Sequence, residues 1–117
     1  MRAAICAAIV CLCAAPSIFA QDAVKVDPKH YTVISENDQV RILKAHYGPH
    51  EKSVMHSHPE AIAVFLTDAH HKFTYPDGRT EDINATAGSV QHMDAFTHLP
   101  ENLSKTPFEV IAVELKR

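Results

Sequence analysis

The sequence predicts an all-β domain, either a sandwich or a closed barrel. After residue 20 the chain holds about eight short runs rich in β-branched and aromatic residues, at spacings near ten residues. Turn residues separate these runs, and no segment shows a convincing helical period. With 117 residues, no internal repeat and no low-complexity tract, the chain has room for one domain.

The individual strands follow in order. Residues 31–35 and 40–47 alternate roughly between apolar and polar side chains, and Glu36-Asn37-Asp38 between them predicts a hairpin. The remaining strands are predicted over residues 61–67, 70–75, 80–84, 89–93, 97–103 and 108–116. Pro76-Asp77-Gly78 predicts a tight turn, because proline fixes φ and glycine accepts a positive φ.

The first 20 residues predict a secretory signal peptide. Arg2 gives a positive start, residues 3–15 are apolar, and Pro16 precedes small residues that end at Ala20. A transmembrane anchor is the alternative, but it needs about 20 apolar residues and this run stops after about 13. We therefore expect a protein exported to the periplasm or secreted, free of the membrane after cleavage, with an N-terminal arm over residues 21–30.

Charge and cysteine content exclude several classes of function. Cleavage after residue 20 removes all three cysteines, so no disulfide and no thiolate would remain in the mature domain. Only Arg2 of the 11 basic residues is lost with that segment, against 14 acidic residues that all remain. This acidic balance argues against nucleic acid as a partner.

Histidine spacing is the most informative chemical feature. All nine histidines follow residue 20. His56 and His58 are two residues apart, so in an extended strand their rings project to one side and can share an ion. Several neutral imidazoles without a thiolate suit a divalent transition metal such as Fe, Zn, Cu, Ni or Mn. Two exposed histidines around a serine would also explain the pair, so the pair alone does not decide the matter.

The wider pattern resembles the cupin superfamily, in particular its small single-domain members. The positions that match the two motifs of this family are Gly48, His56, His58, Gly88, His98 and Asn102. The resemblance covers residues 31–116 and implies a jelly-roll β-barrel domain over residues 31–117 with a metal ion on His56, His58 and His98. It also implies a small-molecule ligand or substrate in the barrel and a homodimer that covers exposed strand edges.

The first motif departs from the family pattern at one ligand. The family glutamate would fall at Ile62, so three imidazoles would form an uncharged set of ligands with open coordination positions. His92 is a candidate fourth ligand, and Glu60 is another side chain that could replace the glutamate. The side chains expected to fill the barrel beside the metal are Ile62, Val64, Phe73, Val90 and Phe96.

Two functions remain open at this point. The resemblance implies either a dioxygenase-like oxidoreductase or an isomerase acting on a small organic molecule. The alternative is a non-enzymatic protein that binds a metal or a small ligand, because the same fold hosts both classes. The other five histidines, at positions 30, 46, 50, 70 and 71, are expected at the surface.

Overall fold

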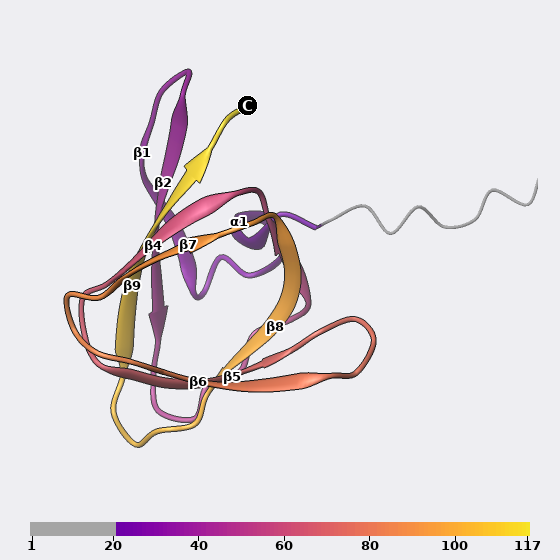
Figure 1. The fold of residues 1–117 in the computed structure, drawn as a ribbon, viewed down its shortest axis with the longest axis vertical. Coiled ribbons are helices and arrows are strands. Elements are labelled where there is room, and N and C mark those ends of the chain that lie inside the picture. The colour runs from indigo at the N-terminus through magenta and orange to yellow at the C-terminus, as the bar shows by residue number, and fades with distance from the viewer. Residues whose placement is uncertain (1–20) are drawn as a thin grey trace, which may run out of the picture.

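The computed structural model describes residues 21–117 and confirms an all-β domain (Figure 1). The predicted signal peptide lies outside the described residues. The elements are α1 (Ala23–Val26), β1 (Tyr31–Glu36), β2 (Val40–Tyr47), β3 (His56–His58), β4 (Ala61–Phe65), β5 (Ala69–Thr74), β6 (Thr80–Ala85), β7 (Val90–Met93), β8 (Phe96–Asn102) and β9 (Phe108–Leu115). In the described part of the chain, no helix is long and apolar enough to cross a membrane.

Two antiparallel sheets form the barrel. One has five strands in the order β1-β2-β9-β4-β7, and the other has four in the order β3-β8-β5-β6. Figure 1 shows the two sheets facing each other across a common interior. Strands far apart in sequence therefore become neighbours, and β9 at the end of the chain lies between β2 and β4.

Tight turns set the pairing of the hairpins. The predicted turn at Pro76-Asp77-Gly78 joins β5 to β6, and Gly78 has a φ of 87° that favours glycine. Asn37 closes the hairpin between β1 and β2, because its side-chain oxygen accepts hydrogen bonds from the backbone N–H groups of Gln39 and Val40. Such side-chain contacts are the reason that asparagine is frequent in turns.

Alanines on the inner face of the larger sheet leave space inside the barrel. Ala45 on β2, Ala61 and Ala63 on β4, and Ala112 on β9 all line the interior pocket. Larger aromatic side chains from both sheets surround this space. Because the methyl group of alanine fills little volume, these inward-facing alanines leave the centre of the barrel hollow.

The structure corrects the predicted orientation of β4 and β7. Ile62 and Val64 lie on the outer face of β4, and Val90 on β7 is 65% exposed. Their sequence neighbours point inward instead, so Ala61, Ala63, Phe65, Gln91 and Met93 line the pocket. The prediction was off by one residue because β4 is apolar on both faces, and side-chain direction in a strand reverses at every position.

The N-terminal arm packs against the strand that carries two of the candidate ligands. Ser57, between His56 and His58, donates its backbone N–H to the carbonyl of Gln21 at 2.8 Å. Ala23 in α1 is fully buried. The arm thus covers the outside of β3 and places Asp22 and Asp27 near the histidines.

Candidate metal centre and barrel pocket

Three histidines predicted as ligands come together inside the barrel. His56 and His58 lie on β3, His98 lies on β8, and His56 pairs directly with His98 across the two strands. All three are buried, and each offers one ring nitrogen within 4.8 Å of the others. Strand pairing therefore joins residues that are about 40 positions apart in sequence.

Burial keeps two of these imidazoles neutral. Desolvation lowers the pKa of His56 from 6.5 to about 4, with a smaller contribution from the nearby charge of His58. Desolvation also lowers the pKa of His98 strongly, and the neighbouring histidines add to this effect. A neutral imidazole has the free lone pair that a metal ion requires.

The residues that precede β3 contact Nδ1 of His56 and orient its ring. Its Nδ1 lies 2.8 Å from the carbonyl oxygen of Val54, which fixes Nδ1 as the protonated nitrogen. Ser53 lies on the same side, with its Oγ 3.3 Å from Nδ1, and donates a hydrogen bond to Asp27 of the arm. The free Nε2 of His56 faces Nε2 of His98 at 3.1 Å.

A buried carboxylate orients His58. Nδ1 of His58 lies 2.8 Å from Oε2 of Glu114 on β9, and both side chains are almost fully buried. Arg41 donates to Oε1 of Glu114 at 2.8 Å and also pairs with Asp22 of the arm. The negative charge of Glu114 is therefore balanced by Arg41, and the other nitrogen of His58 is directed toward the cluster.

Glu114 reaches His58 because of its strand partner. Its direct neighbour on β4 is Ala61, so both side chains point into the barrel. The small alanine leaves room for the carboxylate. Sequence reasoning missed Glu114, because it lies far from both histidine motifs and only the pairing of β9 with β4 brings it to the site.

His98 has no comparable anchor among the described residues. Its Nδ1 is buried without a hydrogen-bond partner, and its ring lies between Phe73 and Phe96 at centroid distances of 4.3 and 4.4 Å. Aromatic packing and the contact of its Nε2 with Nε2 of His56 therefore position this ring.

The three-histidine group fits a transition metal. Two nitrogen ligands bound at roughly 2.1 Å lie at most about 4.2 Å apart, so small side-chain rotations would close the group on one ion. The donor set is neutral, nitrogen-only and free of thiolates, which suits Zn, Fe, Cu or Ni better than Mg or Ca. Two of the three rings also have the oriented second nitrogen that is usual for metal-binding histidines.

The structure contradicts the placement of His92 at this centre. His92 lies on the outer face of β7 opposite Ile62, and its side chain is 58% exposed. Its Nε2 contacts Oε1 of Glu60 at 2.9 Å, so the two candidates for the missing family ligand pair with each other at the surface. The reason is again the one-residue error in the orientation of β7.

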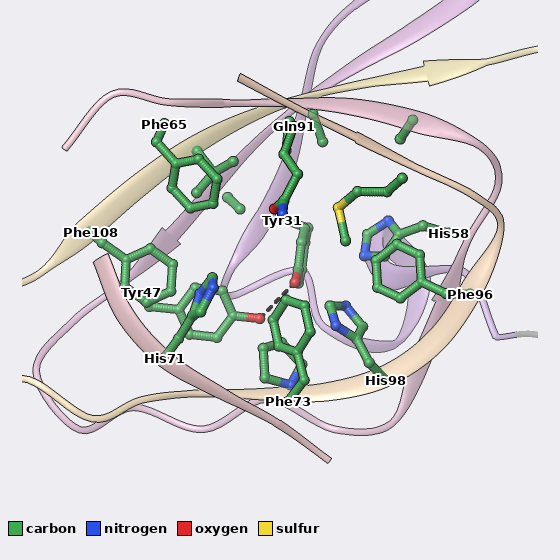
Figure 2. Close-up of a pocket in the computed structure, with 17 residues that line it drawn as sticks. Tyr31, Tyr47, His58, Phe65, His71, Phe73, Gln91, Phe96, His98 and Phe108 are labelled. Atoms are coloured by element: carbon green, nitrogen blue, oxygen red, sulfur yellow. Dashed lines mark hydrogen bonds between the residues drawn. The ribbon is translucent and has the colours of Figure 1, made fainter. Parts of the chain in front are cut away.

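The pocket beside the centre is apolar and lined by aromatic rings. His58, His98, Phe73 and Phe96 form its wall at the end that holds the candidate ligands, so two of the five predicted pocket residues line it (Figure 2). The remaining aromatic and polar lining residues are Tyr31, Tyr47, Phe65, His71, Gln91 and Phe108. The space open to the centres of water-sized molecules is about 70 Å³.

Two tyrosines inside the pocket form a pair. Tyr47 donates its hydroxyl proton to the hydroxyl oxygen of Tyr31 at 2.7 Å (Figure 2). Burial raises the pKa of both phenols, so both remain protonated. The Tyr31 ring lies 4.8 Å from the His56 ring, so this pair forms the wall of the pocket next to the candidate metal centre.

Two of the histidines expected at the surface are buried. His30 contacts Asp27 at 2.7 Å and stacks on Tyr47, and His71 points into the barrel from β5. His46 and His50 are exposed, as predicted, and His70 is half-buried. Alternation along β5 explains why His71 faces inward while its neighbour His70 does not.

Two positions of the family motifs have structural roles. Asn102 is fully buried and donates its side-chain amide to the carbonyls of Gly48 and Thr106 at 3.0 and 2.9 Å. A Cβ at Gly48 would displace the carboxylate of Glu51, which accepts a hydrogen bond from the Gly48 N–H. Both residues fix the loop that leads into β3.

Solved structures resemble this arrangement. A cupin domain from Bordetella pertussis Tohama I matches with a TM-score of 0.69 and 22% identity, covering 74% of this chain and 92% of that chain. The chain has the cupin fold. An uncharacterised double-stranded β-helix protein from Klebsiella pneumoniae matches with a TM-score of 0.59 and 17% identity, covering 73% of this chain and 74% of that one.

A third neighbour in structure is an enzyme. The polyketide cyclase RemF from Streptomyces resistomycificus matches with a TM-score of 0.55 and 16% identity, covering 73% of this chain and 63% of that chain. No family model matches the sequence, and no curated protein matches it. At these identities the comparisons establish the fold alone, and function has to be argued from the site.

Proposed function

We propose that this cupin is an exported protein that binds one divalent transition metal ion on His56, His58 and His98. The observation that carries the proposal is the convergence of three buried histidines, of which His58 is oriented by the buried carboxylate of Glu114. A purely structural cluster would gain nothing from three desolvated imidazoles with a nitrogen of His98 left unpaired.

The adjoining pocket supports a reaction on a small organic molecule. A bound metal ion would act as a Lewis acid and, if redox-active, would support oxidation. The chain itself supplies neutral ligands that leave coordination positions free, aromatic walls that exclude water, and the protonated Tyr31–Tyr47 pair beside the ligands. We propose a dioxygenase-like oxidoreductase or an isomerase.

A second candidate function is metal or small-ligand binding without catalysis. It is favoured by the lack of a charged side chain among the described residues that line the pocket, which leaves the imidazole of His71 as the general base outside the candidate ligands. The metal site is common to both candidates, so it is tested first.

Metal analysis of protein purified without chelator tests the metal site. We expect about one equivalent of a transition metal in the wild type, and a loss of it in His56→Ala and His98→Ala. His92→Ala is the matched control, because it removes an exposed imidazole and should leave metal content unchanged. Wild-type protein without metal, or His56→Ala and His98→Ala proteins that load like the wild type, would refute the proposal.

Turnover separates the enzyme from the binder. The metal-loaded protein is mixed with panels of thiols, diketones and phenols, and oxygen consumption and product formation are followed. Turnover that disappears in His98→Ala supports an enzyme. Stoichiometric binding without turnover across the panel supports the binding protein.

Export and self-association are further parts of the proposal. Expression of the full chain in a bacterium should give a periplasmic protein that begins at Gln21, which mass spectrometry of the purified protein measures. Val33 and Ile34 on the edge strand β1 are exposed, and a homodimer would cover such an edge. Light scattering should then give the mass of two chains.

A further inference from the structure

Apart from the candidate ligand His98, the described residues that line the pocket include one buried side chain with an unpaired nitrogen. His71 on β5 is only 4% exposed and lines the pocket, and its Nε2 makes no hydrogen bond. Figure 2 shows its ring directed into the interior from the wall shared with Phe108. Buried polar groups are nearly always paired, so an unpaired one in a pocket indicates a partner that the protein alone does not supply.

The surroundings of His71 are aromatic on several sides. Its ring lies 4.7 Å from Phe73 and 5.3 Å from Phe108, with Phe65 at 5.9 Å, as centroid distances. These rings separate His71 from the three metal-binding histidines, because Phe73 contacts both His71 and His98. His71 is therefore a polar side chain in an apolar part of the pocket wall, apart from the candidate metal ligands.

The dimensions and charge of the pocket restrict its ligand. The pocket volume of about 70 Å³ is roughly half that of an apolar cavity of about 150 Å³ that takes up one benzene ring. The ligand can therefore be no larger than a single ring. None of the described lining residues is Lys, Arg, Asp or Glu, so in the metal-free protein a charged ligand would lose hydration without a charge partner.

We propose that the barrel pocket binds a small uncharged aromatic molecule with one hydroxyl group, a monocyclic phenol, and that the His71 imidazole hydrogen-bonds this hydroxyl. Aromatic walls favour a flat ring through edge and face contacts. A hydroxyl both donates and accepts, so it suits either tautomer of a neutral imidazole. Burial supports the neutral form, since it lowers the pKa of His71 to about 4.

This inference builds on the proposed function, because it names the class of molecule that would lie beside the metal. It does not depend on the metal, however, since His71 belongs to a different part of the wall. The test therefore uses chelator-treated protein first and zinc-loaded protein second, with phenol and toluene as probes. The two probes share the ring and differ in the hydroxyl.

Calorimetric titration at pH 7 measures the two affinities. We expect wild-type protein to bind phenol more tightly than toluene. The His71→Phe substitution should lower the affinity for phenol roughly three- to tenfold and leave the affinity for toluene unchanged. His71→Gln, which can still hydrogen-bond, should keep the preference for phenol. His70→Phe is the matched control, because His70 lies on the opposite face of β5 and should not change either affinity.

Thermal unfolding distinguishes a binding role from a structural one. His71→Phe removes an unpaired buried group, so we expect its Tm to equal or exceed that of the wild type. If His71→Phe does not fold, ¹⁵N spectra of the wild type give the answer, since phenol but not toluene should shift the His71 ring nitrogens. Equal affinity for both probes, retention of the preference in His71→Phe, or no His71 shift with phenol would overturn the inference.

The same experiments test the metal site independently of the phenol site. Phenol binding that depends on His71 in protein unable to load zinc supports this inference and refutes the metal centre. Zinc loading on a protein that shows no preference for phenol supports the metal centre and refutes this inference.

Discussion

Two of the histidine–carboxylate pairs among the described residues have nearly equal lengths but lie in different environments. His58 contacts Glu114 at 2.8 Å, with side-chain exposures of 6% and 2%, and His92 contacts Glu60 at 2.9 Å, with exposures of 58% and 32%. An exposed pair contributes little because water competes for both partners, whereas a buried pair cannot lose one partner without leaving the other desolvated. The two pairs differ in burial and not in contact distance. For this reason the His58–Glu114 pair can orient a metal ligand, whereas the His92–Glu60 pair is an ordinary surface contact.

Removal of the buried carboxylate should have the largest effect on stability. Glu114→Ala leaves the His58 Nδ1 and the Arg41 guanidinium without their shared partner, which we expect to lower the free energy of unfolding by about 3–5 kcal/mol. Urea denaturation of chelator-treated protein measures it. The matched variant Glu60→Ala should change stability by less than about 1 kcal/mol, and equal effects of the two variants would contradict the comparison.

A milder change separates orientation from charge. Glu114→Gln keeps an oxygen that can accept from His58 but loses the negative charge, so we expect zinc affinity to fall by about 10–100-fold. Competition with a fluorescent chelator measures the affinity. Zinc affinity in Glu60→Gln should equal that of the wild type, and a similar loss there would show that distant surface charge, rather than contact with His58, controls binding.

Acid should destabilise the fold through its buried imidazoles. Burial lowers the pKa of His71 from 6.5 to about 4, so between these values the unfolded chain binds a proton that the folded chain does not. Stability is unaffected by this group above pH 6.5, falls by about 1.4 kcal/mol per pH unit between 6.5 and 4, and levels off below. In His71→Phe, urea denaturation at several pH values should give a slope smaller by this amount, and an unchanged slope would contradict the assignment.

The smallest effect is expected at the exposed pair. His92→Ala removes a surface contact, and we expect a change within about 0.5 kcal/mol in unfolding free energy. Denaturation and zinc titration of the same sample check both properties. A loss of zinc affinity in this variant would restore His92 as a ligand and contradict the geometry of β7.

Much of the fold could be predicted from the sequence. Strand positions follow from β-branched runs and from turn residues such as Asn37 and Gly78, whose preferences act locally. Whether His56 and His58 share a face depends only on their spacing along one strand, so their common face was predictable too. His98 needed the resemblance to a known family, because its distance from the other two is bridged only by strand pairing.

The orientation of β4 and β7 could not be predicted in this way. Both faces of β4 carry apolar residues, so the pattern gives no sign of which face is inside. On β7 the sequence Val-Gln-His-Met offers one polar and one apolar residue to each face. The prediction of Ile62, Val64 and Val90 in the pocket and of His92 at the metal centre was wrong for this reason.

The sequence by itself thus determined an all-β domain, its turns and a pair of histidines on one side of a strand, because these depend on interactions between near neighbours. Only the tertiary structure decided that Glu114 reaches His58 and that His71 lies unpaired among aromatic rings. Those relations depend on which strands pair and which faces close on the interior, and the chain settles both only when it folds.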